Sequence, residues 1–398
     1  MLVQILKKIP VAKAVNSLLK ARSQERRAAD SLARCRAEAE RRGIAVPNEA
    51  ILRDLLRARL SARPHPQWPK SKGRLHVFMA YYLENWEFVY PRSMTPFGKV
   101  TVYDWRSRGY DSRDADWLLK RDAMNADMLD AFRKANAEQP VDAVLGYLSG
   151  HNTAPETLLE MARAGAAIFN CNYDDKLLMP GTLAGGRDTS PAGIASAVDL
   201  NLSNAPDSVL KYFVYGGLGL FCPQGAQPDI HAPRPGPFEF DVSFIGAKYG
   251  SRPRFIAALK KHGIDVACFG KGWSGGTVTD DDIIRIFSHS RINLGIAGIA
   301  HSNKLCCIKG RDFELPMCGG LYLTQEHPDI HHIYDVGREI LTYRDAGDAA
   351  AKIHALLADP DRAAQIRQAG YARARRDHAW EARWERVFKL AGILEAPA

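Results

Sequence analysis

The feature that most constrains the fold is a regular alternation of strand-like and helix-like runs in the second half of the chain. Apolar runs at residues 241–247, 265–270 and 291–298 alternate with helix-like runs at 251–263 and 280–290. Strands and helices that alternate at these lengths predict βαβ units, in which parallel strands pair and helices cover both faces of the sheet. The sequence therefore predicts a doubly wound α/β domain beyond residue 240.

The first half of the chain repeats this alternation. Strand-like runs occupy residues 74–82, 99–105, 141–149 and 166–172, with helix-like runs at 115–137 and 154–164. A chain of 398 residues exceeds the roughly 250–300 residues at which a single hydrophobic core stops growing. Two domains are therefore expected. No apolar run approaches the roughly 18 residues that a membrane span requires.

Positive charge is concentrated in the N-terminal segment. Residues 1–63 contain 15 lysines and arginines against six acidic residues, which accounts for the whole net charge of +9. The first part of this segment places apolar residues at near-helical spacing on either side of Pro10: Leu2, Ile5, Leu6, Ile9, Val15, Leu18 and Leu19. This pattern predicts a basic helical arm that contacts an anionic membrane surface or an acidic partner. A solvated helical extension explains the same pattern.

The cysteines argue for a reduced protein. Their number is odd, their surroundings are mostly apolar, and no two of them form a C-x-x-C pair: Cys35, Cys171, Cys222, Cys268, Cys306, Cys307 and Cys318. Neither a disulfide framework nor a zinc site is therefore expected, and the composition favours a cytoplasmic protein.

A second informative segment is KGRDFELPMCGGLYLT at residues 309–324. A short helix is predicted from Asp312. Gly319 and Gly320 are expected to end this helix by adopting positive φ, after which residues 321–324 re-enter a strand.

The start of this predicted helix combines groups that suit a sugar nucleotide. Exposed backbone N–H groups favour an anion, and Lys309 and Arg311 add two full positive charges. Glu314 offers a carboxylate to hydroxyl groups. A helix with a solvated charged cap explains this segment equally well when it is taken alone.

The order of the pieces resembles the C-terminal half of the GT-B glycosyltransferases, and most of all the subfamily related to spore-maturation CgeB proteins. The matching segments are FIGAKYGSR at 244–252, FGKGW at 269–273, RINLGI at 291–296, the segment 309–324, and AGYARARRDHAWEARWERVF at 369–388. The likeness is specific over residues 241–388, looser over 74–224 and absent before them. It implies a GT-B fold, in which two Rossmann-like doubly wound domains face a cleft.

The resemblance and the composition together divide the chain into four parts. Residues 1–72 form the basic helical arm and a proline-containing linker, and residues 73–225 form an acceptor domain. Residues 226–377 form the nucleotide-sugar domain. Residues 378–398 form a helix that crosses back to the first domain.

The resemblance also implies donor-site residues at matching positions. Glu314 falls where related transferases place the glutamate that receives the ribose hydroxyls. Lys248 and Arg252 occupy the loop in which the family's basic side chains meet the diphosphate, and Gly246 lets the backbone approach closely. Because two cations at a helix entry are unfavourable without an anion, this loop favours a site over a charged surface. Trp273 either stacks on the base or packs at the domain edge.

One position departs from the family pattern. Many retaining members have a second glutamate eight positions before the first, and this chain has Cys306 there. The stereochemical outcome therefore stays open. Inversion would require a base from the first domain, where His151 and Asp174 each follow a predicted strand. A surface histidine, and an aspartate in a helix cap or turn, are the alternatives.

Other polar residues also follow the predicted strands of the first half. Asn85 and Trp86, Asp104 and Asp175 occupy positions where parallel sheets commonly bind ligands.

Several motifs are better explained without function. The G-x-G-x-x-G pattern at residues 270–275 opens no helix, so a dinucleotide site is not expected. Asp114 and Asp116 form a D-x-D pair that is expected to cap the next helix. His327 and His331 have metal-ligand spacing without a third ligand nearby, so no metal site is predicted.

These observations and the resemblance favour a glycosyltransferase, and the resemblance implies that it is metal-independent and has no bound cofactor. Its co-substrate would be a nucleotide-diphosphate sugar, and its acceptor a hydroxyl group of a cell-envelope glycan, a lipid-linked glycan or a protein. A nucleic-acid partner is not expected. The protein would be cytoplasmic, with peripheral contact at the inner face of the membrane through residues 1–63. A nucleotide-sugar epimerase or hydrolase, or a catalytically silent interaction protein, are the alternatives.

Overall fold

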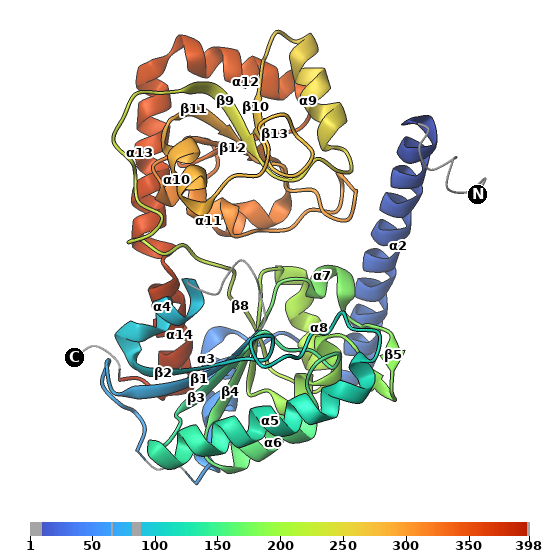
Figure 1. Ribbon diagram of the computed structural model, residues 1–398, viewed down its shortest axis with the longest axis vertical. Helices are drawn as coiled ribbons and strands as arrows, with labels where there is room; N and C mark the ends of the chain where they lie inside the picture. The colour runs from blue at the N-terminus through green and yellow to red at the C-terminus, as the bar shows by residue number, and fades with distance from the viewer. Residues whose placement is uncertain (1–9, 65–66, 82–88, 396–398) are drawn as a thin grey trace. The chain divides into compact units, whose positions relative to one another are not determined.

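A computed structural model describes residues 10–64, 67–81 and 89–395 and divides the chain into two compact units. The six-stranded unit comprises Ala28–Pro223 and Glu381–Ala398, and the five-stranded unit comprises Met1–Arg27 and Gln224–Trp380. Each unit contains a parallel sheet with helices on its faces (Figure 1). The predicted pair of Rossmann-like domains is therefore confirmed.

The six-stranded unit has the strand order β2-β1-β3-β4-β7-β8, and every neighbouring pair is parallel. Its strands are β1 (Leu75–Tyr81), β2 (Gly98–Asp104), β3 (Ala143–Gly146), β4 (Ala167–Asn172), β7 (Leu200–Ser203) and β8 (Gly219–Phe221). A short antiparallel hairpin, β5 (Leu183–Ala184) and β6 (Arg187–Asp188), stands apart from the sheet. All seven residues of β1 are buried, as expected for a central strand covered on both faces.

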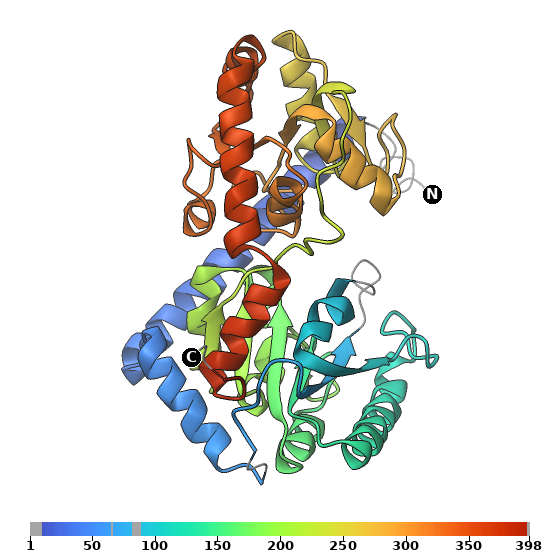
Figure 2. The same cartoon turned by 90° about the vertical axis from the view of Figure 1, so that its left-hand side faces the viewer.

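The helices of this unit lie on opposite faces of its sheet (Figure 2). One face is covered by α5 (Trp117–Glu138) and α6 (Pro155–Arg163), whose apolar residues form a single core cluster with the sheet. The other face is covered by α14 (Trp380–Ala391), since Phe388 of this helix packs against Phe169 of β4. The remaining helices are α3 (Glu49–Ser61), α4 (Val89–Met94), α7 (Asp175–Leu178), α8 (Val209–Val214), and the 3-10 turns η1 (Thr95–Phe97), η2 (Pro191–Gly193), η3 (Ala195–Ala197) and η4 (Pro206–Ser208).

The five-stranded unit has the parallel order β10-β9-β11-β12-β13. Its strands are β9 (Phe240–Ile245), β10 (Ala267–Phe269), β11 (Ser290–Leu294), β12 (Tyr322–Gln325) and β13 (Leu341–Tyr343). Its helices are α9 (Arg252–Lys261), α10 (Asp280–Ser288), α11 (Arg311–Met317), α12 (Ala346–Ala358), α13 (Pro360–Asp377) and the 3-10 turn η5 (Pro328–His332). Residues of α9, α12 and α13 join the sheet in one core cluster.

An apolar stripe of the C-terminal helix α14, which includes Trp384 and Phe388, belongs to the core. Trp384 and Phe388 of α14 are fully buried in the six-stranded unit. Phe388 makes an edge contact with Phe97, and the Trp384 ring N–H donates to the hydroxyl of Ser93. The stripe therefore has a packing role.

The predicted basic arm contains one long helix, α2 (Pro10–Arg42). Pro10 is the first described residue of this helix, which continues without interruption to Arg42. Residues 1–9 lie outside the described part of the chain. None of the described helices combines the length and the apolar character that a membrane crossing needs.

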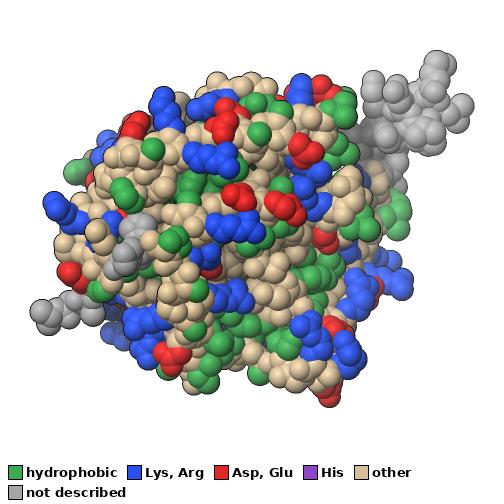
Figure 3. Space-filling view, turned by 90° about the horizontal axis from the view of Figure 1, so that it is seen from below, with side chains coloured by type: hydrophobic (Ala, Val, Ile, Leu, Met, Phe, Trp, Pro, Cys, Tyr) green, Lys and Arg blue, Asp and Glu red, His purple; other side chains and the backbone are tan. Residues whose placement is uncertain are grey.

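The structure also bears on the charges and the cysteines. All seven cysteine side chains are buried, and none of them forms a disulfide. On the face seen in Figure 3, lysine and arginine side chains are interspersed with aspartate and glutamate. This face therefore shows no continuous surface of one charge.

Candidate functional site

The candidate site lies at the carboxyl ends of β9 and β11 in the five-stranded unit. The chain passes from β9 to β10 on one side, whereas β11 lies on the other side of β9. The loops that follow β9 and β11 therefore diverge, and such a switch point is where open parallel sheets bind ligands. Residues 246–251 form the first loop and residues 295–310 form the second.

Arg252, the first residue of α9, meets Gly246 of the first loop. A methyl group on Gly246 would lie 3.1 Å from Nη1 of Arg252, so glycine permits this close approach. The guanidinium donates to the carbonyl of Ala247 at 2.9 Å and lies over the Tyr249 ring, 4.3 Å from its centroid. Burial lowers the pKa of Arg252, and the positive charge of Arg311 lowers it further.

Lys248 and Trp273 form a second pair beside this loop. The ammonium of Lys248 lies 4.9 Å from the centroid of the Trp273 ring. The indole N–H donates to the carbonyl of Gly246 at 2.8 Å, and the ring meets Phe244 edge to face. Trp273 therefore packs at the edge of the sheet, which was one of its two predicted roles. One face of its ring is already in contact with Lys248.

Lys309, near the end of the second loop, and Arg311, the first residue of α11, approach the same place. Lys309 Nζ donates to the carbonyls of Ile296 and Gly298, at 3.0 and 3.2 Å. One of the three ammonium N–H groups therefore remains for a ligand. Arg311 Nη1 donates to the carbonyl of Ile245 at 2.7 Å, and its Nε is buried without a hydrogen-bond partner in the described structure.

We call Lys248, Arg252, Lys309 and Arg311 the cation cluster. Among the residues that the structure describes, none of its four side chains forms an ion pair with a carboxylate. Burial lowers the pKa of Lys309, and the charges of Arg252 and Arg311 act in the same direction. Arg252, Lys309 and Arg311 influence one another electrostatically, and neighbouring cations that form no ion pair favour an anion between them. Lys248 is exposed and adds a further positive charge from the first loop.

The start of α11 differs from its prediction. The helix has seven residues, and the amides of Asp312, Phe313 and Glu314 already donate to the carbonyls of Lys309 and Gly310. The anion-binding capacity of this region therefore resides in side chains more than in bare N–H groups. Gly319 ends the helix with φ of +72°, as predicted, whereas the prediction of a positive φ at Gly320 is wrong.

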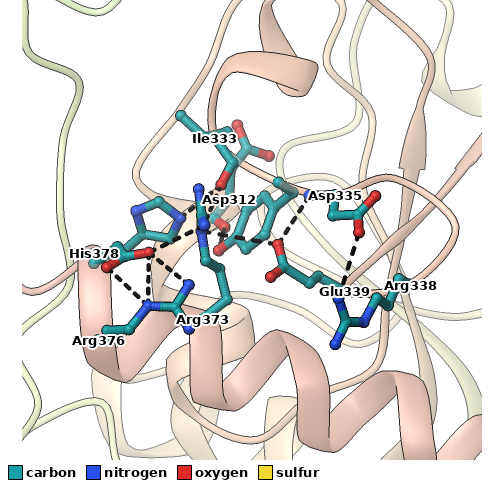
Figure 4. A network of polar contacts seen from close by, with 10 residues as sticks. Asp312, Ile333, Asp335, Arg338, Glu339, Arg373, Arg376 and His378 are labelled. Atoms are coloured by element: carbon teal, nitrogen blue, oxygen red, sulfur yellow. Dashed lines mark hydrogen bonds and ion pairs between the residues drawn. The ribbon is translucent and has the colours of Figure 1, made fainter.

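Buried hydrogen bonds hold α11 in place. The Asp312 carboxylate accepts from the amide of Lys309 at 2.7 Å and from the hydroxyl of Tyr322. The hydroxyl of Tyr334 donates to the Asp312 carbonyl at 2.8 Å. Figure 4 shows this region, where Arg373 of α13 lies 3.8 Å from the Glu339 carboxylate. Asp312 therefore has a supporting role.

Glu314 is accessible to a ligand, as its predicted contact with ribose hydroxyls requires. Its side chain is partly exposed and has no hydrogen bond or ion pair with another described residue. The carboxylate folds back toward the start of α11, so that a methyl group on Gly310 would lie 2.9 Å from Oε1. Glu314 does not neutralise Arg311, which leaves the carboxylate available to hydroxyl groups of a ligand.

The second loop contains a tight hairpin that the sequence did not predict. Gly298 and Cys306 form an isolated antiparallel bridge, and the amide of Ile299 donates to the carbonyl of Leu305. Cys306, which occupies the position of the missing glutamate, is buried at the base of this hairpin. The family's carboxylate therefore has no counterpart at this position.

The predicted acceptor-side residues lie in the six-stranded unit. His151 Nε2 is 3.4 Å from the carbonyl of Ser112, and its ring lies beside Trp117. Asp174 is exposed, and its carboxylate accepts from the hydroxyl of Tyr147 at 3.1 Å. His151 and Asp174 share no hydrogen-bond partner among the described residues. Asn85 and Trp86, which were also predicted at strand ends, lie outside the described ranges.

Helix capping, the alternative explanation for the predicted aspartates, is not observed at Asp174 or Asp116. Asp174 precedes α7, but its side chain does not cap that helix. Asp116 likewise makes no cap to α5; together with Asp114 it pairs with Lys120, at 3.0 and 2.9 Å. The capping prediction for this pair is therefore wrong. Asp175 is completely buried, and its carboxylate accepts from the hydroxyl of Tyr212.

The described residues contain no cluster of three or more potential metal ligands among histidine, cysteine, aspartate and glutamate. His331 instead contacts Glu326 at 2.7 Å.

Comparison with known proteins agrees with this fold. A family model described as glycosyl transferase-like matches residues 252–389. No curated protein matches the chain significantly by sequence.

Solved structures resemble most of the chain. Sucrose-phosphate synthase from Thermosynechococcus elongatus has a TM-score of 0.55 and 12% identity, covering 80% of this chain and 98% of its own. The Anabaena protein HepE, solved with UDP and glucose, has a TM-score of 0.55 and 11% identity, covering 79% and 99%. A glycosyltransferase from Rickettsia africae has a TM-score of 0.54 and 10% identity, covering 80% and 98%. At these identities the likeness establishes the fold, and the chain has the GT-B fold of these glycosyltransferases.

Proposed function

We propose that this chain is a glycosyltransferase that moves a sugar from a nucleotide-diphosphate sugar to a hydroxyl group of an acceptor. The family match over residues 252–389 supports the reaction class. The CgeB-like subfamily is the branch to which we assign it, on the motifs at 244–252 and 309–324. HepE has been solved with UDP and with UDP-glucose, so uridine nucleotides are the first ligands to test.

The observation that carries this proposal is the cation cluster with an unpaired carboxylate nearby. A diphosphate would supply the negative charge that Lys248, Arg252 and Arg311 lack in the described structure. Glu314, three residues beyond Arg311, would accept hydrogen bonds from the ribose hydroxyls. The alternative explanation was a helix start whose charges are solvated by water. Arg311 Nε does not fit this alternative, because it is buried and has no hydrogen-bond partner in the described structure.

The same groups would promote departure of the nucleotide. Breaking the bond between the sugar and the diphosphate leaves negative charge on the diphosphate oxygen, and fixed cations stabilise that charge as it develops. Because the cations perform this task, we propose that transfer needs no bound metal or other cofactor. Lys309 would act mainly by holding the second loop through its two carbonyl contacts.

We assign the general base toward the acceptor to His151, with Asp174 as the second candidate. A hydrogen bond from Nε2 to the Ser112 carbonyl would leave Nδ1 of the neutral ring as the acceptor. His151→Gln should lower turnover by about 10²- to 10⁴-fold while the affinity for UDP stays unchanged. If Asp174→Asn produced that loss and His151→Gln did not, the base would be Asp174.

The deciding experiment measures binding first and chemistry second. The melting temperature of the full chain should rise with UDP or another nucleoside diphosphate at millimolar concentration. Nucleotide release from a panel of sugar nucleotides should then depend on an added glycan, lipid-linked glycan or protein acceptor. Release of free sugar without an acceptor would indicate a hydrolase or epimerase. If no nucleotide bound, the enzyme proposal would be abandoned in favour of an interaction protein.

We propose in addition that the basic arm rests on the inner face of the membrane. Val15, Leu18 and Leu19 of α2 are 50%, 47% and 60% exposed. Two cations, Lys20 and Arg22, follow within three residues of Leu19. The double variant Leu18→Ser, Leu19→Ser should bind vesicles containing anionic lipids less than the wild type does. Equal binding would remove the membrane role.

A further inference from the structure

The tip of the hairpin in the second loop has an unusual backbone. Ala300 and His301 have φ of +51° and +67°, and the amide of Ser302 donates to the carbonyl of Ile299. Two consecutive positive φ values within such a bond describe a type I′ turn, which normally requires glycine or asparagine. Side chains in this conformation are strained, so neighbouring structure must hold them there.

The first half of α2 supplies that support within the five-stranded unit. Ser17 Oγ lies 3.1 Å from Nδ1 of His301. One position further along the turn, the hydroxyl of Ser302 donates to the carboxylate of Glu25. Ser17 and Glu25 are eight residues apart, so a stretch of about 12 Å of helix spans these two contacts.

The far side of the hairpin tip faces the cation cluster. The His301 ring meets the Tyr249 ring edge to face, with centroids 5.4 Å apart. The Tyr249 ring in turn lies against the guanidinium of Arg252. A methyl group on Gly250 would lie 3.0 Å from Cα of His301, so the two loops pack closely here.

We propose that the first half of α2 is a clamp that positions Arg252 for the donor diphosphate. The clamp acts through a continuous series of contacts from Ser17 to His301, then to Tyr249, and finally to Arg252. The inference rests on the proposed function, because it assigns the diphosphate to Arg252. It adds a role for the basic arm that is separate from membrane contact, since the exposed Leu18 and Leu19 do not take part.

The contacts explain why a helix so distant in sequence is needed at the site. An aromatic ring that lies against the Tyr249 ring limits its rotation, and Tyr249 limits the guanidinium. Fixing the guanidinium before binding removes part of the entropy cost of holding the ligand. Ser17, His301 and Tyr249 are therefore positioning residues, and only Arg252 would touch the diphosphate.

The test compares full-length wild type with Ser17→Ala, measuring the dissociation constants of UDP and of uridine by calorimetry or ligand-observed NMR. Ser17→Ala should raise that of UDP by about 3- to 10-fold, the range of one neutral hydrogen bond. The value for uridine should stay the same, because uridine has no diphosphate for Arg252. Ser17→Thr keeps the hydroxyl and should restore UDP binding.

Two further variants separate the clamp from general destabilisation. Ser23 is exposed on the same helix, so Ser23→Ala should bind both ligands as the wild type does. In a Tyr249→Leu background the series of contacts is already broken, and adding Ser17→Ala should then have no further effect on UDP.

The outcomes distinguish the two proposals. If wild type binds UDP and Ser17→Ala binds it equally well, the clamp is overturned while the proposed function stands. A parallel loss of UDP and uridine affinity in Ser17→Ala would also overturn it, because the effect would then be structural. Wild type that binds no nucleotide would overturn the proposed function, and the clamp with it.

Discussion

Each unit contains a lysine whose ammonium is buried against backbone carbonyls, and the two lysines have different surroundings. In the six-stranded unit, Lys211 is 1% exposed and donates to the carbonyls of Asp175, Lys176 and Met179. In the five-stranded unit, Lys309 donates to only two carbonyls. Burial lowers the pKa of both lysines.

The difference lies in the neighbouring charges. The carboxylate of Asp175 opposes the effect of burial on the pKa of Lys211, so this cation has its counter-charge inside the protein. At Lys309, Asp312 also opposes the effect of burial on the pKa, but the charges of Arg252 and Arg311 add to that effect. A cation that is fully bonded and balanced supports the fold, whereas cations that repel one another leave a place for an anion. The comparison thus separates a structural cation from a candidate binding site.

The largest expected effect comes from breaking the balanced pair. Lys211→Met would remove one donor from each of three carbonyls, of which those of Asp175 and Met179 keep a second donor, and would leave the Asp175 carboxylate without its counter-charge. We expect the free energy of unfolding to fall by about 3–5 kcal/mol, as when one partner of a buried pair is removed. Urea denaturation measures this change.

Lys309→Met is the matched control for that variant. It removes a cation from a repulsive group, so the loss of stability should be clearly smaller, while UDP binding weakens. Equal losses of stability in the two variants would show that Lys309 supports the fold as much as Lys211 does, and would contradict the distinction between them.

The second prediction concerns the pH dependence that Asp175 imposes. Burial is the main cause that raises the pKa of this carboxyl to about 6 in the folded chain, from an ordinary value of 3.8. The folded state therefore holds the proton more tightly, and its contribution to stability is complete below pH 3.8 and lost as the pH rises through about 6. The loss should reach at most about 3 kcal/mol.

Asp175→Asn isolates this contribution. The stability of the wild type relative to this variant should decline between about pH 4 and pH 6, as measured by urea denaturation at each pH. Asp361→Asn, at an exposed position of α13, should follow the wild type throughout. A constant difference between wild type and Asp175→Asn across this range would contradict the raised pKa.

The elements of both sheets were predictable because their signals are local. The apolar run at 241–247 became β9, and that at 166–172 became β4, since apolar β-branched runs flanked by turns determine buried parallel strands. The positions of Lys248, Arg252 and Glu314 followed from the family motifs and from their place after a strand or in a helix. Such residues can be found without knowledge of distant contacts.

The parts that escaped prediction depend on contacts between distant segments. Nothing in the letters GIAHSN announces a type I′ turn, because neither Ala300 nor His301 is a residue that this turn prefers. The partner of His301 is Ser17, 284 positions away. Lys309 was predicted as a phosphate contact, whereas most of its N–H groups bind carbonyls of its own loop. The sequence shows that Lys309 is a cation, but it does not show which groups the ammonium contacts, because the conformation of the folded loop determines that.

The third prediction tests the unbalanced cations. Arg311→Met should raise the dissociation constant of UDP by about 10- to 100-fold, the range for hydrogen bonds to charged groups. The melting temperature should change little, because a repulsive neighbour of Arg252 is lost together with one carbonyl contact. Calorimetry and thermal denaturation measure the two quantities.

Arg291→Met provides the control for a balanced cation in the same unit. Arg291 pairs with Asp241 at 3.1 Å on the surface, so this variant should bind UDP normally. Equal UDP affinity in wild type and Arg311→Met would place the anion elsewhere.

The smallest effect should come from the carboxylate beside the cluster. If Glu314 accepts hydrogen bonds from the ribose, wild type should bind UDP about 3- to 10-fold more tightly than 2′-deoxy-UDP, since one hydroxyl contact is lost. Glu314→Ala should bind the two ligands equally, whereas Asp361→Ala should keep the preference. Because removing a negative charge beside four cations could by itself strengthen diphosphate binding, the ratio of the two affinities is the informative quantity. A preference that survives in Glu314→Ala would assign the ribose to another side chain, even if the cation cluster still bound the diphosphate.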